Sequence, residues 1–300
     1  MRNGEIDRAA IMESAESSPI DEPFIEYIPR VNCIVQNNGL IPPPFPIIER
    51  MAALGIPNSH RESQLGHSET LTEMTGELIE GLDNAGIIQV QTDTLARLKT
   101  GAFLHDIGKT GPESAINPNP AIFVKLFNTD FSGDLRHVKF RTALFQATQE
   151  GKITQEEKIY IERVLREYGI DPDKMTLRTF FNLHSLFTYG VLLEGGMSEE
   201  MARIAASHHL KREIRPNGYS WSELAETGRF IEPMDELAAM VRRNNPKTLQ
   251  MSCIERIRAV YEGFSPLRKS VGTPYQETIQ TALNHGILQR IVEKHPHQKN

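Results

Sequence analysis

Apolar residues recur along most of this chain at steps of three and four, the spacing that places them on one face of an α-helix. A stripe that runs from His67 through Leu71 and Leu78 predicts a helix ending at Gly81. Strand-like alternation and βαβ patterns do not occur, so the expected fold class is all-α. Further helices are predicted over about 94–107, 138–149, 154–168, 176–194, 198–212, 233–241, 253–261 and 273–283.

Several helix ends carry local signals. Thr154 and Glu157 form a capping box, which satisfies exposed amides at a helix start. Ser198 is expected to cap another helix, and Gly169 to close one. Pro233 fits the first turn of a helix, where its missing N–H leaves no hydrogen bond unmade. These signals predict separate helices joined by loops.

The pattern divides the chain into a leading segment and one domain. Residues 1–46 are assigned to an acidic N-terminal tail followed by a proline-rich strap. Residues 47–296 form the expected domain, with a helical insertion over about 110–180 and C-terminal helices over about 250–294.

Composition narrows the class of protein. With 39% apolar residues among 300 and a formal charge of -6, a soluble globular protein that binds no extended nucleic acid is expected. The two cysteines, Cys33 and Cys253, lie far apart, which fits a reducing compartment. Apolar runs fall short of the ~18 residues that span a membrane, and the N-terminus lacks a signal-peptide core. We therefore expect a cytoplasmic protein without membrane partners, with a homodimer as a possible assembly.

Histidine and aspartate side chains gather on the apolar faces of the predicted helices. Such groups are costly in a core unless they are paired or bound to a metal, and helical bundles build metal sites from facing helices. Each histidine taken alone could equally be a hydrogen-bonded core residue, and His60 competes with His67 for its role. The candidate metal ligands are His67, His105, Asp106, His184, His208, His209 and Asp235.

This ligand set favours two divalent transition metal ions. Imidazole-rich sites suit iron or manganese, with zinc, nickel and cobalt as alternatives, whereas calcium and magnesium prefer oxygen ligands. Seven ligands exceed what one tetrahedral ion needs, and Asp106 could bridge two ions with its two oxygens. Paired metals activate water for attack on phosphorus. Asp106 and Lys109 are therefore the expected catalytic residues, with Lys109 also binding a phosphate oxygen.

His67, His105-Asp106 and Asp235 together resemble the H…HD…D signature of the HD-domain metal-dependent phosphohydrolase superfamily. His105-Asp106-Ile107-Gly108-Lys109, with His184, His208-His209 and Gly218-Tyr219, resembles its HD-GYP phosphodiesterase branch. Ser220 stands where that branch has proline, and Ser63 where trimetallic members have glutamate, so two ions are expected rather than three. The resemblance implies a helical bundle with a di-iron or di-manganese centre in its core.

The resemblance further implies hydrolysis of a cyclic dinucleotide similar to cyclic di-GMP by a metal-bound hydroxide. A nucleotide phosphomonoesterase or dNTP hydrolase on the same centre is the alternative enzyme. A catalytically silent module that binds a nucleotide or protein is the alternative from another class. Arg212 and Arg215 are candidate substrate contacts or part of a solvated loop. Tyr219 is a candidate substrate contact or a turn residue that packs on Trp221.

Overall fold

The computed structural model describes residues 25–56, 63–131, 133–209, 221–242, 250–259 and 274–295. These ranges contain helices and no strand, which confirms the all-α class. Within them, no helix is long and apolar enough to cross a membrane. The helices are η1 (Ile25–Tyr27), α2 (Ile28–Asn37), α3 (Phe45–Ala53), α4 (Gln64–Asn84), α5 (Thr92–Leu104), η2 (Ile107–Thr110), α6 (Pro120–Phe127), α7 (Phe140–Gln149), α8 (Gln155–Glu167), α9 (Leu177–Glu194), α10 (Glu199–Ala206), η3 (Ser207–His209), α11 (Trp221–Arg242), α14 (Pro274–Asn284) and α15 (Ile287–Lys294).

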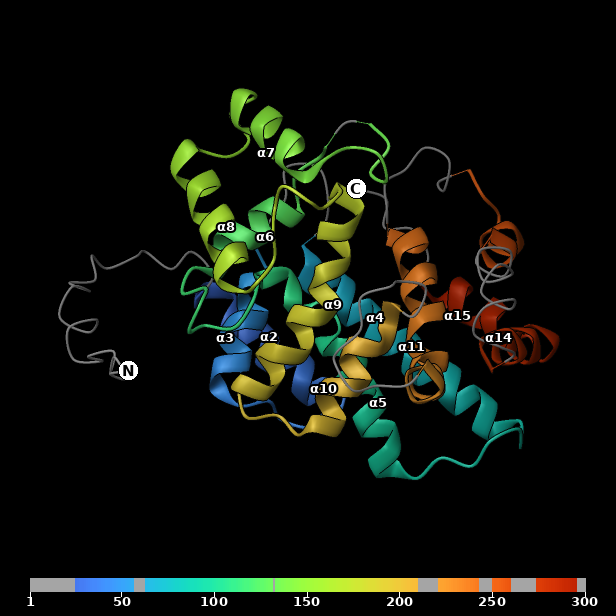
Figure 1. Cartoon of the computed structure of the whole chain (residues 1–300). Coiled ribbons are helices and arrows are strands. Elements are labelled where there is room, and N and C mark those ends of the chain that lie inside the picture. Colours follow the sequence, from blue (N-terminus) through green and yellow to red (C-terminus); the bar gives the residue numbers. More distant parts are fainter. Residues whose placement is uncertain are drawn as a thin grey trace.

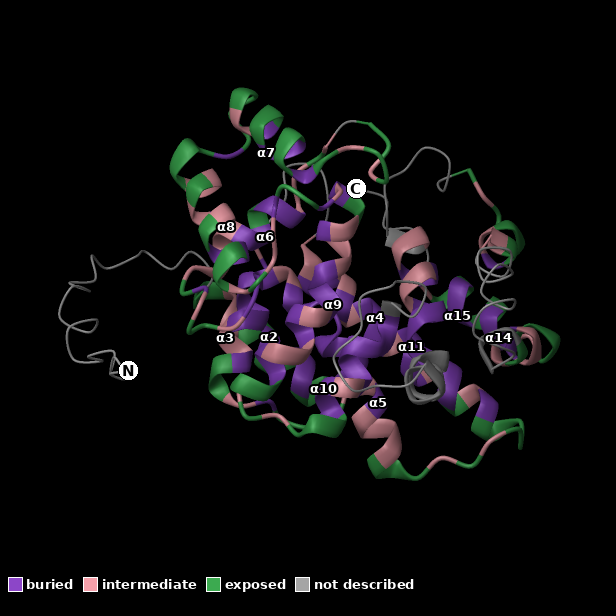
Figure 2. Cartoon of the chain, in the orientation of Figure 1, coloured by how far each residue is buried: buried purple, intermediate pink, exposed green. Residues whose placement is uncertain are grey.

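Three clusters of buried apolar residues hold these helices together. One joins α4, α11, α14 and α15. A second joins α2, α3, α5 and α10. A third joins α6, α7, α8 and α9. Figure 2 shows the buried positions on the inner sides of the helices. Helices α4, α5, α9, α10 and α11 form the centre of the molecule, between the α6–α8 lobe and the C-terminal pair (Figure 1).

Close packing at the centre depends on glycine. A Cβ atom on Gly101 of α5 would lie 2.3 Å from Cγ2 of Ile204 on α10. Such a distance is far below van der Waals contact, so a larger residue would separate the two helices. Gly101 therefore brings α10 close to α5, just ahead of the His105-Asp106 pair.

The expected insertion forms a lobe on one side of the bundle (Figure 1). The α7–α8 part of this lobe begins and ends at an isolated antiparallel bridge between Lys139 and Thr176. Phe140 N–H donates to Met175 O at 3.1 Å beside it. The lobe packs back through Phe140, which stacks on Phe180 of α9 with ring centroids 4.5 Å apart.

The cap signals are confirmed. Thr154 and Glu157 make the reciprocal capping box of α8. The Ser198 hydroxyl accepts from Met201 N–H at 3.2 Å at the start of α10. Gly169, at φ +83°, follows the end of α8 in the left-handed conformation that glycine favours.

Two features differ from the sequence expectation. Helix α2 lies within the segment assigned to the tail and strap, and it buries Val31, Ile34 and Val35. Pro233 lies inside α11 and not in a first turn. A proline costs an internal hydrogen bond there, and burial of Met234 and Leu237 beside it offsets that cost. Residues 1–24 of the tail lie outside the described residues.

Candidate metal centre

Six of the seven candidate ligands come together between the helices at the centre of the bundle. His67 lies on α4, His184 on α9 and Asp235 on α11, while His105 and Asp106 follow the end of α5. His208 lies in η3, directly after α10. The side chain of His209 lies outside the described residues, as do Arg212, Arg215 and Tyr219.

Three of the imidazole rings are held by their own helices. Nδ1 of His105 lies 2.8 Å from Ala102 O, and Nδ1 of His208 lies 2.8 Å from Ala205 O. Nδ1 of His184 makes the equivalent contact with the carbonyl three residues earlier, at 2.5 Å. A carbonyl oxygen can only accept, so each Nδ1 carries a proton and Nε2 is the ring nitrogen that faces the other ligands. Metal-binding histidines are held by backbone carbonyls in the same way.

The Nε2 atoms of these rings converge. Nε2 of His184 lies 3.0 Å from Nε2 of His208. Nε2 of His105 is fully buried and makes no hydrogen bond within the described part of the chain. Burial first, then the neighbouring histidines, lower the pKa of His208 well below its usual value, so that ring is neutral. Imidazole nitrogens that converge in a buried site are a suitable environment for a cation.

Asp106 lies among these three rings and is almost fully buried. Its Oδ1 is 3.3 Å from His184 Nε2 and 3.9 Å from His208 Nε2, and its Oδ2 is 3.2 Å from His105 Nε2. Burial alone would raise the pKa of this carboxyl, but His105 and Lys109 hold it well below its usual value. Asp106 is therefore ionised, with both oxygens directed at imidazole nitrogens.

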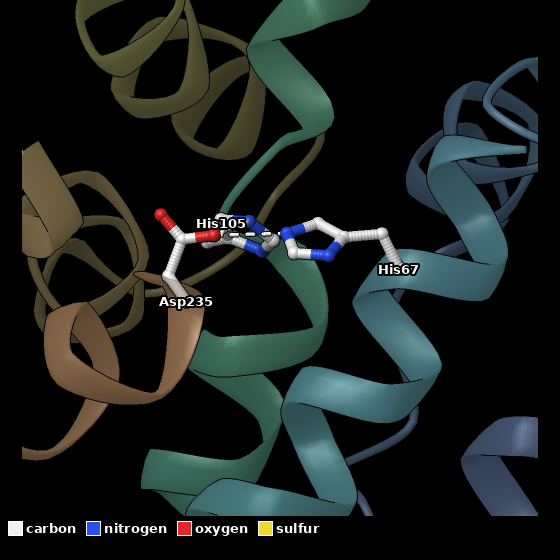
Figure 3. A group of neighbouring side chains, drawn as sticks. All are labelled: His67, His105 and Asp235. Carbon is white, nitrogen blue, oxygen red and sulfur yellow. Dashed lines mark hydrogen bonds and ion pairs between the residues drawn. The ribbon is translucent and has the colours of Figure 1, made fainter. Parts of the chain in front are cut away.

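A second acidic group faces the other side of His105. Asp235 Oδ1 lies 2.8 Å from His67 Nε2 and 3.7 Å from His105 Nε2 (Figure 3). Burial would raise the pKa of Asp235, but its contact with His67 and the charge of His105 lower it. The carboxylate is ionised beside two imidazole rings from different helices.

Two groups of residues are close enough to bind a metal ion. One consists of His67, His105 and Asp235, and the other of His105, Asp106 and His208. In each group one ligand atom from every residue lies within 4.8 Å of the others. The nitrogen and oxygen donors are of the type that iron, manganese and zinc accept. His105 belongs to both groups, so the two potential positions adjoin.

Lys109 lies beside this centre. Its Nζ pairs with Asp106 Oδ2 and donates to Gln64 Oε1 at 3.0 Å. Gln64 Nε2 in turn donates to Asn128 Oδ1 at 3.1 Å. Lys109 is therefore held at the site by one ligand carboxylate and by a row of two amides.

The His105–Lys109 segment is fixed against α9. Thr188 Oγ1 donates to His105 O at 2.8 Å and accepts from Gly108 N–H at 3.0 Å. A Cβ on Gly108 would lie 1.9 Å from His184 O. Glycine is therefore required for η2 to approach α9 this closely, and the approach brings Asp106 to His184.

Arg50 holds the loop that follows Lys109. This buried guanidinium of α3 donates to Thr110 Oγ1 at 3.0 Å, to Pro112 O at 2.8 Å and to Asn117 O at 3.2 Å. Burial lowers the pKa of Arg50 to about 10. Five donors in a rigid plane allow one side chain to fix several loop carbonyls.

Sequence reasoning missed Gln64, Asn128, Thr188 and Arg50. Gln64 lies one turn before His67 and Thr188 one turn after His184, so helical spacing could have indicated both. Asn128 and Arg50 act on segments about sixty residues away in the chain, and local periodicity carries no signal for such contacts. Ser63, noted in place of a glutamate, caps α4 by accepting from Gly66 N–H.

Comparisons of the chain with protein-family profiles, with curated proteins and with solved structures found no match. Function is therefore argued from the geometry of the site.

Proposed function

We propose that this chain is an HD-type, metal-dependent phosphohydrolase, a phosphodiesterase acting on a cyclic dinucleotide similar to cyclic di-GMP. The observation that carries the proposal is the convergence of three carbonyl-anchored imidazoles and two ionised carboxylates beside a lysine. A purely structural cluster would pair its buried nitrogens with donors or acceptors. His105 Nε2 makes no hydrogen bond within the described part of the chain, and two carboxylates from different helical segments, Asp106 and Asp235, lie 3.2 Å and 3.7 Å from it.

His67, His105 and Asp235 would hold one ion, and Asp106 with His184, His208 and His209 a second. Divalent transition metals in such a pair supply Lewis acidity and lower the pKa of coordinated water towards ~7. Asp106 suits the shared position, because its two oxygens face imidazoles from three different helical segments. Iron or manganese agrees best with this donor set.

Lys109 would bind the substrate. Asp106 and Gln64 are its two acceptors within the described part of the chain, and an ammonium has three N–H donors. The remaining donor can reach a phosphoryl oxygen at the edge of the metal centre. A compact positive charge there offsets the negative charge that develops on phosphorus during attack by water.

The choice of a cyclic dinucleotide as substrate is supported by the amino-acid sequence. Gly218-Tyr219 and the basic residues Arg212 and Arg215 support a loop that binds a second phosphate or a purine. A phosphomonoesterase or dNTP hydrolase would use the same metal centre, and a silent nucleotide-binding module would use the same site. An activity assay is needed to distinguish these three functions.

The test combines metal analysis with a substrate panel. Protein purified anaerobically should contain about two transition metal ions per chain. With manganese or iron it should hydrolyse a cyclic dinucleotide faster than mononucleotides or a generic phosphodiester. Activity confined to mononucleotides would refute the phosphodiesterase and favour a phosphomonoesterase or dNTP hydrolase. Bound metal without turnover of any substrate would favour the silent module.

Matched variants identify the site. Asp106→Ala should lose both metal and activity, because the substitution removes the carboxylate that would bind the metal ions together with the buried histidines. Asp134→Ala removes a carboxylate that is half exposed and paired with Arg136, and it should retain both. Absence of stoichiometric metal from the wild-type protein would refute both enzyme readings.

A further inference from the structure

A row of polar side chains leads from the metal centre to the insertion. Lys109 Nζ donates to Gln64 Oε1, and Gln64 Nε2 donates to Asn128 Oδ1. Asn128 is the residue that ends α6, the first helix of the insertion. The insertion therefore forms part of the site, on the side where Lys109 lies.

Aromatic rings continue from the end of this row. The Phe127 ring, next to Asn128 in the chain, lies 5.9 Å from the His184 ring between centroids. The Phe181 ring lies 5.8 Å from Phe127 and 6.1 Å from Phe131. Phe181 also precedes His184 by one helical turn, and its carbonyl anchors the His184 ring. Phe131 and Phe181 thus adjoin the metal centre through Phe127 and through α9.

The exposure of these two rings sets them apart from their neighbours. Phe123, Phe140, Phe180 and Phe187 in the same apolar cluster are fully buried. Phe131 and Phe181 are only partly buried. Burying the remaining ring surface would be favourable. A partly exposed aromatic pair beside a polar site is the arrangement on which nucleic-acid bases stack.

We infer that Phe131 and Phe181 form a stacking surface for the base of a nucleotide whose phosphate lies at Lys109. The inference rests on the proposed function and adds where the base binds and which residues recognise it. Gln64 and Asn128 lie between the phosphate side and the aromatic side, and their amides can both donate and accept, as base edges require. The insertion supplies Phe131 and α9 supplies Phe181, so the two together select substrates that carry a planar aromatic group.

The test compares two ligands that differ only by a base. Manganese-loaded full-length protein is titrated calorimetrically with guanosine 5′-monophosphate and with ribose 5-phosphate. Phe131→Leu and Phe181→Leu should weaken binding of the nucleotide by about 5- to 100-fold. Binding of ribose 5-phosphate should change less than about twofold, because its phosphate contacts remain.

Further variants separate stacking from folding. Phe131→Trp restores an aromatic face and should keep nucleotide affinity close to wild type. Phe145→Leu removes an exposed ring from the outer side of α7 and should change neither affinity. Thermal melting of each variant shows whether the fold is retained. A leucine variant that melts early is replaced by Phe→Met at the same position, which fills a similar volume without an aromatic face, and the same two ligands are titrated.

Three outcomes are decisive. Loss of nucleotide binding alone in the leucine variants supports the stacking surface. Equal affinity of the wild-type protein for the two ligands, or equal loss of both in the variants, overturns it while the metal-dependent activity still stands. Failure of the metal-loaded protein to bind either ligand, with no turnover of the substrate panel, overturns the proposed function and the stacking surface together.

Discussion

The Nε2 atoms of His184 and His208 lie 3.0 Å apart, although each ring already donates its Nδ1–H to a backbone carbonyl. Both rings are buried, and both Nε2 atoms also face Oδ1 of the Asp106 carboxylate, at 3.3 Å and 3.9 Å. Two nitrogen donors and one carboxylate oxygen thus converge, as the ligands of a metal ion do. The fold therefore holds these two side chains in positions that favour cation binding.

This relationship predicts that metal stabilises the protein. Adding manganese, iron or zinc to metal-free protein should raise its Tm by several degrees, since ligand at 100 times its Kd adds about 2.7 kcal/mol. Differential scanning fluorimetry measures the shift. His208→Ala should lose most of the response, whereas His137→Ala, a change at an exposed ring, should keep it. A Tm that no divalent metal changes would contradict the proposed centre.

Lys109→Met should lower kcat of the metal-loaded enzyme by about 10²- to 10³-fold, because a charge that stabilises the reacting phosphate is lost. Metal content should persist, since the histidines and carboxylates remain. Steady-state kinetics and elemental analysis measure the two quantities. Lys125→Met serves as the matched control, because Lys125 pairs with Glu157 on the outer surface. Unchanged kcat in Lys109→Met would remove the lysine from the reaction.

Gly108→Ala should destabilise the fold and impair metal binding together. Its Cβ would meet His184 O at 1.9 Å and Thr188 N at 2.4 Å, both backbone atoms. Gly76→Ala is the control: its Cβ meets only the flexible Lys99 side chain, at 3.2 Å. In mid-helix that change should be neutral or should stabilise by up to about 1 kcal/mol. Equal behaviour of the two variants in denaturant unfolding would argue against the close approach of η2 to α9.

Glu113 provides a pH test outside the metal centre. Burial first, then the charge of Glu194, raises the pKa of Glu113 above its usual 4.5. A raised folded-state pKa means that the carboxyl favours folding below the unfolded pKa, and that this benefit is lost as pH rises through the folded value. The Tm of Glu113→Gln relative to wild type should therefore increase from about pH 4 to pH 7.

Glu150→Gln is the control for that series. Glu150 is about half exposed, so its substitution should give a Tm difference that changes little over the same pH range. If the Tm of Glu113→Gln relative to wild type stays constant or falls as pH rises, the folded protein does not disfavour the ionised form of the Glu113 carboxyl.

Local patterns were sufficient for the all-α class and for several helices, but not for α2 or for the start of α11 at Trp221. The apolar stripe of α9 places His184 on the buried face with Phe180 and Phe187, and the structure agrees. Caps at Thr154 and Ser198 were recognisable because their hydrogen bonds close within three residues. Interactions between residues only three or four positions apart can be predicted from the sequence alone.

Contacts that depend on packing were not predictable. Gln64 meets Asn128 only because the fold brings the start of α4 to the end of α6, and Arg50 reaches its loop across a similar separation in the chain. Pro233 shows the same limit, since a proline at a helix start and one inside a helix give similar local signals. Tertiary burial of Ile231 and Met234 decides between them.

The bridge between Lys139 and Thr176 has an evolutionary consequence. A loop whose ends are paired loses little additional chain entropy as it lengthens, because closure cost grows only with the logarithm of its length. Residues between those ends can therefore be gained, lost or exchanged while the ligand-bearing helices stay in register. Asn128 and Phe131 lie before the bridge, on the bundle side, so such changes could alter the outer lobe without moving the residues next to Lys109.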